Sequence, residues 1–458
     1  KDDLVTLEPI ENLNCSPCLS FFDESADEYV LFNDTYKIID GLQNDEHVLG
    51  PSDSVSISFQ HIDKSGLIIK KKLTFFGDSY EINHNFNLLN TDDFYSNSLE
   101  LRWVGGLAPT EPIELDDITY ASAMSGQAGE TEDINQTTAD NGYERMVLDG
   151  TTNWVSIRNK YFTAALIGDD SGSFATLESQ NGAFFGRELT PQYSASIGYA
   201  LPIEKISSRL YLGPLDLKHI KKTQTNLDDT MNFGFTLIRP IGKGILWFLT
   251  FMHDSLPLNY GFILILFAFL DRIITGPLTK KSFESSQKMQ KIQPLVKKLQ
   301  KKYKDNPTKM NQEVMGLYKE KGVNPLGGCL PMLLQMPLLW ALFVVFRSTI
   351  EFRGAQFIFW INDLSQPDAI FNLPFNIPLY GGHVAVLPIL MGLSIFLTQK
   401  MSMATMDKAQ RPMMYIMNGF FVLLFNQFPS GLNLYYTVYN VLNYFQQRTI
   451  KAKSNMAL

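Results

Sequence analysis

The chain has 458 residues, 45% of them hydrophobic and 19% charged, and its formal net charge is −8. The charge is divided unevenly, because residues 1–237 carry a net charge of −21 and residues 238–458 a net charge of +13. This division argues against a single globule. It indicates two environments, one for an acidic soluble part and one for a basic part built from apolar runs.

The acidic part is predicted to be β-structure. Many strand-like runs without intervening helical patterns predict an all-β sandwich over residues 1–215. The polar, glycine-rich segment 126–142 is expected to be a loop. A large sandwich can bind sugars or peptides in a cleft, and Trp103 or Trp154 would serve there if exposed, although a buried core tryptophan is the commoner case. The runs of alternating or β-branched residues lie at 54–60, 67–76, 81–89, 99–104, 154–167, 193–200 and 210–212.

Cysteine use predicts no metal centre. Cys15 and Cys18 form a CxxC motif, but the sequence has no second pair of ligands near it, and zinc needs about four. A redox role would require a thioredoxin-like βαβ pattern, which the surrounding residues do not have. We therefore expect a structural disulfide or idle thiols, and we expect no metal and no cofactor.

The two parts are joined by a segment without strand alternation, residues 216–237, which we interpret as a connector. Residues 238–256 follow, with apolar residues at helical spacing that include Ile241, Ile245 and Leu249. This segment is too short and too interrupted to span a bilayer, so an interfacial amphipathic helix is predicted. A buried helix of a soluble protein is the alternative.

Five apolar segments in the rest of the chain, residues 257–458, are candidate transmembrane helices. They lie at about residues 258–278, 328–346, 384–399, 412–428 and 431–446. The last three are short against the roughly 20 residues that a span usually needs. Twelve lysines lie within residues 280–321, so the positive-inside rule places that loop in the cytoplasm and the acidic part on the other side of the membrane.

Arg272 lies inside the first apolar segment. An arginine at membrane depth costs about 2.5–3.5 kcal/mol on insertion scales, so it usually faces a hydrated cavity or a partner. Asp271 does not neutralise it, because adjacent helical residues point to different sides. Polar residues of the other segments could line a groove with Arg272, although each alone is more often a contact between helices. These residues are Gln335, Asn418, Asn426, Gln427, Asn433, Tyr435, Tyr436, Thr437, Asn440 and Asn443.

The lysine-rich loop is predicted to be a helical hairpin over residues 280–322. Apolar residues repeat every three or four positions, as in Ile292, Val296 and Leu299, and the pattern resumes after the break at residues 305–307. The exterior is basic. It is either a solvated face that sets orientation or a docking site for ribosomal RNA or another acidic partner. The candidate docking residues are Lys288, Lys291, Lys297, Lys298, Lys301 and Lys302.

Several motifs resemble the YidC/Oxa/Alb family of membrane protein insertases. DRIITGPLTKKS at 271–282 is similar to the arginine-bearing span of that family, and NPLGGC, QMP, FWINDLS and FPSGLNLYYTVYN are similar to later family segments. The acidic part with its YLGP at 211–214 resembles the large periplasmic domain of the Gram-negative YidC branch. The resemblance covers essentially the whole chain.

The resemblance implies a periplasmic β-supersandwich, followed by an α-helical core of five spans with a cytoplasmic helical hairpin. It implies an inner-membrane location with residues 1–237 in the periplasm, and one further span before residue 1. Arg272 would be the groove arginine, and Tyr435 and Tyr436 would border the groove. The sequence departs from the family pattern at Ala268 and Asp271, and in a longer outer loop at 368–383.

The implied function is that of an insertase and chaperone for nascent membrane proteins, acting alone or with the Sec translocon, and bound by the ribosome. Such a protein is not an enzyme and has no small-molecule substrate. A secondary transporter or anion channel that uses Arg272 is the alternative, but it would typically contain an inverted repeat, and we find none in the sequence. A glycan-binding or envelope-assembly module anchored by its helices is a third hypothesis.

Overall fold

The computed structural model describes residues 15–41, 46–63, 66–91, 97–111, 114–135, 142–184, 187–323, 330–403 and 411–456. The start of the predicted 328–346 span and part of the predicted 126–142 loop lie outside these residues. The chain forms two compact units, Lys1–Asn232 and Phe233–Leu458. The division falls inside the segment that we interpreted as a connector.

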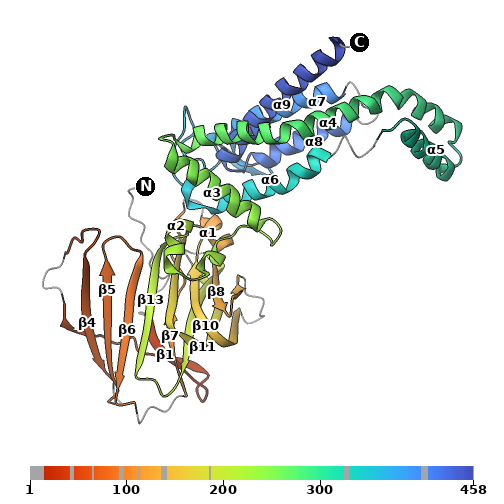
Figure 1. The fold of residues 1–458 in the computed structure, drawn as a ribbon. Helices are drawn as coiled ribbons and strands as arrows, with labels where there is room; N and C mark the ends of the chain where they lie inside the picture. The colour runs from red at the N-terminus through yellow and green to blue at the C-terminus, as the bar shows by residue number, and fades with distance from the viewer. Residues whose placement is uncertain are drawn as a thin grey trace. The chain divides into compact units, whose positions relative to one another are not determined.

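The first unit is β-rich, as predicted from the alternating runs (Figure 1). In β5, for example, Ile69 is buried while Lys70 and Lys72 are exposed, which is the period of a strand with one buried face. The described strands of this unit are β1 (Cys18–Asp23), β2 (Glu28–Leu31), β3 (Lys37–Asp40), β4 (Ser54–Ile62), β5 (Ile68–Phe76), β6 (Glu81–Leu89), β7 (Ser98–Trp103), β8 (Ser122–Gln127), β9 (Glu130–Ile134), β10 (Tyr143–Arg158), β11 (Phe162–Phe184), β12 (Arg187–Ala200) and β13 (Lys205–Pro214).

These 13 strands are joined by hydrogen bonds into one antiparallel sheet, in the order β2-β1-β7-β12-β11-β13-β6-β5-β4-β3, with β10, β8 and β9 branching from β11. The long strand β11 makes the join, because it pairs with β13 over its first part and with β12 from Phe174 onward. One hydrophobic core contains Ile69 of β5, Leu101 of β7 and Ile197 of β12. The sheet therefore folds over on itself and buries one face.

One segment of this unit differs from the sequence interpretation. The predicted loop 126–142 contains strand β9, because Ala128 and Gly129 adopt positive φ angles and make the tight turn of a hairpin with β8. Residues 216–231, within the segment that we interpreted as a connector, are packed on this unit. They form α2 (Leu217–Ile220) and the short helices η1 (Lys221–Thr223) and η2 (Leu227–Thr230), and Trp154 holds them by donating from Nε1 to Asn226 Oδ1 at 2.7 Å. Trp103 and Trp154 are both buried.

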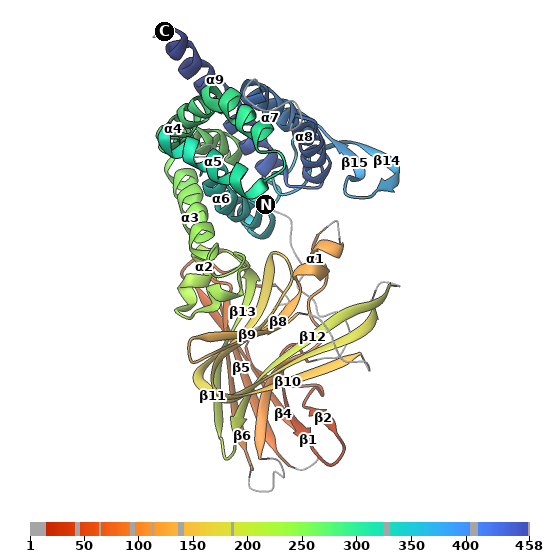
Figure 2. The ribbon, with the colours of Figure 1, turned by 90° about the vertical axis from the view of Figure 1, so that its right-hand side faces the viewer.

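The second unit is helical (Figure 2). Its helices are α3 (Arg239–Ser255), α4 (Tyr260–Lys302), α5 (Pro307–Glu320), α6 (Leu330–Ser348), α7 (Leu387–Met403), α8 (Arg411–Phe425) and α9 (Ser430–Met456), with the short helix η3 (Ile350–Phe352) and the strands β14 (Ala369–Ile377) and β15 (Gly381–Ala385). Helix α3 buries Ile245, Leu246 and Leu249 but exposes the apolar side chains of Ile241, Trp247 and Phe251. Its place at a membrane interface stays a prediction. Helix α4 is capped by Asn259, whose side chain accepts from Gly261 N.

Helix α4 is longer than the sequence predicted. The span expected at 258–278 and the first helix of the hairpin expected from 280 form one helix of 43 residues, which continues past Pro277 and Pro294. Ile292 and Val296 of α4 are buried and α4 contacts α5, whereas the described side chains of α5 are at most partly buried, so the predicted apolar seam is present on the α4 side alone. Of the described helices, α4 alone is long and apolar enough to cross a membrane, over Tyr260–Met289. Shorter apolar stretches occur at Gln335–Ser348, Leu387–Lys400 and Pro412–Phe425, and the five-span count remains a prediction.

Candidate functional site

The candidate site is built around Arg272, in the first half of α4. Its side chain is only 7% exposed. The guanidinium donates from Nη1 to Thr279 Oγ1 and to Tyr439 Oη, both at 3.3 Å, and from Nη2 to Asn443 Oδ1 at 2.9 Å and to Gln446 Oε1. The guanidinium carbon also lies 5.4 Å from the centre of the Tyr439 ring, within the range of a cation–π contact.

The partners of Arg272 come mainly from one face of α9. Tyr436, Tyr439, Asn443 and Gln446 follow one another at intervals of three or four residues, which places their side chains on one stripe of a helix. Helices α4 and α9 pack against each other. The stripe therefore faces the arginine along more than two turns of α9.

All four hydrogen-bond partners of Arg272 are neutral. Within the described part of the chain, no carboxylate forms an ion pair with this guanidinium. Its Nε is buried without a hydrogen-bond partner. Buried charges in proteins are usually paired, so an unpaired buried cation is a strong candidate for binding an anion.

A cavity of about 200 Å³ opens beside the guanidinium. Its lining is polar and aromatic, with one cation and no acidic side chain, so it offers hydrogen-bond donors to a negatively charged group. The lining residues are Arg272, Thr279, Gln335, Tyr436, Tyr439, Asn440 and Asn443.

Asp271 lies away from this cavity, as expected for the residue next to Arg272. Its carboxylate accepts a hydrogen bond of 2.6 Å from Tyr435 Oη, and both side chains are buried. The Tyr435 ring packs against Phe267 of α4. This pair holds α4 and α9 together beside the site and is absent from the cavity lining.

Of the six predicted groove residues, the structure brings Arg272, Gln335 and Tyr436 together around the cavity. Tyr435 binds Asp271 instead. Asn418 of α8 donates to Gly392 O of α7 at 3.2 Å, and Asn426 holds an outer loop. These three side chains make contacts between or beside helices and do not line the cavity.

The residues that sequence reasoning did not name are Tyr439, Thr279 and Gln446. Asn440 and Asn443 stood among the polar residues that could line a groove, but not among the six groove candidates. The signal that would have found Tyr439, Asn443 and Gln446 is the three-to-four spacing from Tyr436 along α9. Thr279 lies two turns after Arg272 on the same helix, at a separation of seven residues.

A second cavity, of about 520 Å³, lies further along α4 and α9. It is basic, with three lysines and one glutamate, and Glu284 pairs with Lys280 at 3.9 Å. Gln446 contributes to this cavity and also binds Arg272, so the two cavities are neighbours. The lining residues are Lys280, Glu284, Gln287, Lys288, Lys291, Gln446, Thr449 and Ile450.

The six predicted docking lysines are all exposed on α4. They are Lys288, Lys291, Lys297, Lys298, Lys301 and Lys302. The first two line the basic cavity, and the last four lie toward the end of α4 that turns into α5. This arrangement is a basic surface on a helical hairpin, suited to an acidic partner.

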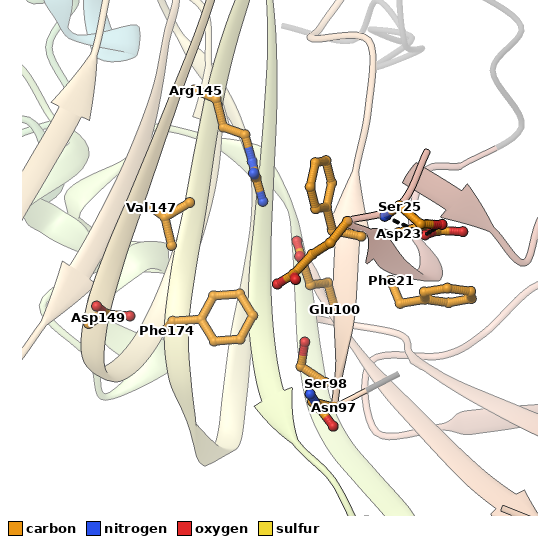
Figure 3. Close-up of a pocket in the computed structure, with 12 residues that line it drawn as sticks. Phe21, Asp23, Ser25, Asn97, Ser98, Glu100, Arg145, Val147, Asp149 and Phe174 are labelled. Atoms are coloured by element: carbon orange, nitrogen blue, oxygen red, sulfur yellow. Dashed lines mark hydrogen bonds between the residues drawn. The ribbon is translucent and has the colours of Figure 1, made fainter. Parts of the chain in front are cut away.

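The β-rich unit contains a cavity of its own, of about 440 Å³ (Figure 3). Arg145, Val147 and Asp149 of β10 line one side of it, and Phe21 and Asp23 of β1 line the other. Glu100 and Arg145 of the lining belong to a network of charges, in which Arg102 binds Glu178 and lies 3.6 Å from Glu100, and Arg145 lies 3.7 Å from Glu178. The two arginines and two glutamates balance one another in charge.

Neither cysteines nor other side chains form a metal centre among the described residues. Cys15 and Cys18 are joined by a disulfide, which is one of the two states expected from the sequence. No group of three or more histidine, cysteine or acidic side chains is placed to hold a metal ion in the described ranges.

Comparison with known proteins gives consistent matches along the chain. Residues 251–457 match the family model described as 60Kd inner membrane protein, and residues 42–248 match the model of the YidC periplasmic domain. A protein of Chloroherpeton thalassium named membrane protein insertase YidC is 39% identical over 401 residues, which cover 86% of this chain and 68% of that protein. A protein of the same name from Chlorobium luteolum is 39% identical over 419 residues, which cover 90% of this chain and 71% of that protein.

The chain thus spans about two thirds of the length of these relatives. Among solved structures, an α-galactosidase from Lactobacillus brevis is 9% identical and has a TM-score of 0.27, covering 46% of this chain and 31% of that one. That likeness is too weak to bear on function.

Proposed function

The chain belongs to the family of the membrane protein insertase YidC, and we propose that it inserts nascent membrane proteins through the cavity beside Arg272. It is an inner-membrane protein with a β-rich periplasmic domain. The observation that carries the proposed role of the cavity is the state of Arg272, a buried guanidinium whose partners are all neutral.

Such a guanidinium favours an acidic side chain of a client. At an effective dielectric constant of about 20, two opposite charges 4 Å apart attract each other by about 4 kcal/mol before desolvation is counted. A carboxylate that reaches the cavity exchanges its contact with water for the charge of Arg272. The polar tail of a client thereby crosses part of the membrane without being left in hydrocarbon.

The basic cavity supplies the access route. Lys280, Lys288 and Lys291 attract an acidic tail from the cytoplasmic side, and Gln446 lies between them and Arg272. The apolar segment of the client then leaves along the exposed apolar faces of the helices, and burial of that segment in lipid drives the process. No covalent step is involved.

The proposed topology has five spans, with the α4–α5 hairpin in the cytoplasm. The exposed lysines of the hairpin support docking of the ribosome, whose RNA is acidic. The β-rich unit would act in the periplasm, and contact with the Sec translocon is one role for it. Relatives named as insertases favour insertion over the transporter or anion channel that Arg272 alone also suggested.

The proposal is tested with the native-length protein in liposomes and a small client that carries an acidic tail. Protease protection of the tail reports insertion. We expect protection with the unchanged chain, a strong loss with Arg272→Gln, and partial function with Arg272→Lys, which keeps the charge. Arg239→Gln on α3 removes a cation outside the cavity and serves as the control. Equal insertion by the Arg272→Gln variant and the unchanged chain would refute the role of the cavity.

A further inference from the structure

The loop between α6 and α7 carries a β-hairpin that the insertase function does not explain. Strands β14 and β15 pair antiparallel, from Ala369 with Ala385 to Ile377 with Gly381, and the register shifts twice between these two pairs. Figure 2 shows the hairpin projecting sideways from the helices of its unit. The 14 residues from 369 to 382 contain no charged side chain.

The hairpin exposes bulky apolar side chains. Ile370, Phe371, Phe375 and Leu379 are each between 57% and 62% exposed. A two-stranded hairpin alone is marginally stable in water, and a cluster of exposed apolar residues marks a surface that something covers. The hairpin is therefore an interaction surface.

Two buried side chains hold this hairpin, Asp368 at its base and Asn426 along β15 and at the turn. Asp368 Oδ2 accepts from Trp360 Nε1 at 2.9 Å, from Val386 N at 3.1 Å and from Leu387 N at 2.8 Å. Asn426 accepts from Ala385 N at 3.0 Å and donates to the carbonyls of Tyr380 and His383 at 2.8 and 2.7 Å. These hydrogen bonds fix the position of the hairpin relative to α7 and α8.

These anchors place the hairpin at the ends of two apolar helices. Leu387 is the first residue of α7, and Asn426 directly follows the last residue of α8. Both helices expose apolar side chains outward, including Ile389 and Leu393 on α7 and Phe420 on α8. The apolar surface of the hairpin continues that of the helices at this end.

We propose that the β14–β15 hairpin is a lipid anchor that lies in the outer leaflet, at the boundary between headgroups and acyl chains. This inference rests on the proposed membrane topology. Lipid suits the surface better than a protein partner, because the hairpin has no charge to orient a partner and exposes mainly aliphatic and phenylalanine side chains beside Asn372 and Asn376. Segments that lie at the membrane surface bury Trp, Phe and Leu side chains at the boundary between headgroups and acyl chains. The anchor sets the depth of α7 and α8, whose apolar stretches are short for a span.

The test uses the native-length protein in liposomes, with Cys329→Ser and one introduced cysteine that carries a nitroxide. Phe375→Cys probes the hairpin, Leu393→Cys is the lipid-exposed reference on α7, and Val48→Cys is the water-exposed reference in the β-rich unit. Phe371→Cys repeats the hairpin measurement at a second exposed position. Accessibility to oxygen, which concentrates in lipid, is compared with accessibility to a water-soluble nickel complex.

We expect the ratio of oxygen to nickel accessibility at both hairpin positions to exceed that of Val48 several-fold and to lie below that of Leu393, which is deeper in the bilayer. A ratio like that of Val48 would mean that the hairpin lies in water, and would overturn the proposal while leaving the insertase function intact. Labels inaccessible to both reagents would mean that protein covers the hairpin, which also overturns it. A water-like ratio at Leu393 would overturn the membrane topology and the anchor together.

Discussion

Arg272 on α4 and Asn443 on α9 are joined by a hydrogen bond of 2.9 Å from Nη2 to Oδ1, across the interface between the two helices. Asn443 offers an oxygen without a negative charge. The contact therefore positions the guanidinium without neutralising it, which leaves the charge available to a client.

The first prediction concerns Asn443. Asn443→Leu removes an acceptor from a buried charged group, and an unsatisfied buried donor costs about 1–3 kcal/mol. We expect a lower thermal midpoint for the helical unit. Asn440→Leu changes a residue that also lines the cavity but is not among the four hydrogen-bond partners of Arg272 in the described part of the chain, so its effect should be smaller. Equal decreases in the thermal midpoint from both substitutions would show that the hydrogen bond to Arg272 does not contribute to stability.

The second prediction concerns the exposed lysines at the end of α4. Lys297→Glu, Lys298→Glu and Lys301→Glu together should weaken co-sedimentation with ribosomes, because affinity for nucleic acid depends on phosphate neutralisation and falls with salt. Lys37→Glu, Lys70→Glu and Lys72→Glu make the same change of charge at exposed positions of the β-rich unit. Equal loss from both triple variants would point to net charge rather than to the hairpin.

The third prediction concerns pH and His84 in β6. Its ring is fully buried, and burial together with the nearby charge of Lys71 holds the pKa of this imidazole well below its ordinary value of 6.5. Below pH 6.5 the unfolded chain therefore binds a proton that the folded chain does not, so the free energy of unfolding falls as the pH falls.

His84→Leu should raise the free energy of unfolding of the β-rich unit by about 1–3 kcal/mol, because both ring nitrogens are buried without a partner in the described part of the chain. It should also flatten the decline below pH 6.5. The measurement is urea unfolding followed over a series of pH values. The substitution His47→Gln at an exposed position is the comparison. An unchanged slope in the His84→Leu variant would contradict the assignment.

The fourth prediction concerns Asn426, which we expected to line the groove and which instead holds the outer hairpin. Asn426→Ala removes three hydrogen bonds to the loop. A nitroxide at Phe375→Cys should then become more mobile, while a nitroxide at Leu393→Cys should not. Unchanged mobility at residue 375 would show that Asp368 alone holds the hairpin.

Part of the helical unit could be predicted from the sequence. The seam of Ile292 and Val296 was predictable, because its helical spacing is independent of the rest of the fold. The continuity of α4 was not predictable, since a proline and a change from apolar to basic residues usually mark the end of a helix. Arg272 was found because a charge in an apolar segment has few explanations.

The partners of Arg272 were harder to predict. A polar residue in an apolar segment either faces a cavity or joins two helices, and both give the same pattern in one sequence. Asn418 joins α8 to α7 through the carbonyl of Gly392, and Asn426 holds the outer hairpin, which the sequence pattern did not indicate. Tyr439 was missed because a tyrosine fits equally well in lipid and in a polar site, and only the face of α9 decides between them.

The role of Arg272 is tested most directly by a double-mutant cycle in which insertion rates are measured. The unchanged chain and the Arg272→Gln variant are each tested with two clients. One client has an acidic tail, and in the other the tail is neutralised by Asp→Asn and Glu→Gln substitutions. If Arg272 acts on client carboxylates, Arg272→Gln should slow insertion of the acidic tail strongly and of the neutral tail little, giving a clear coupling between the two changes. Equal slowing of both tails would mean that Arg272 supports the fold and does not bind the client.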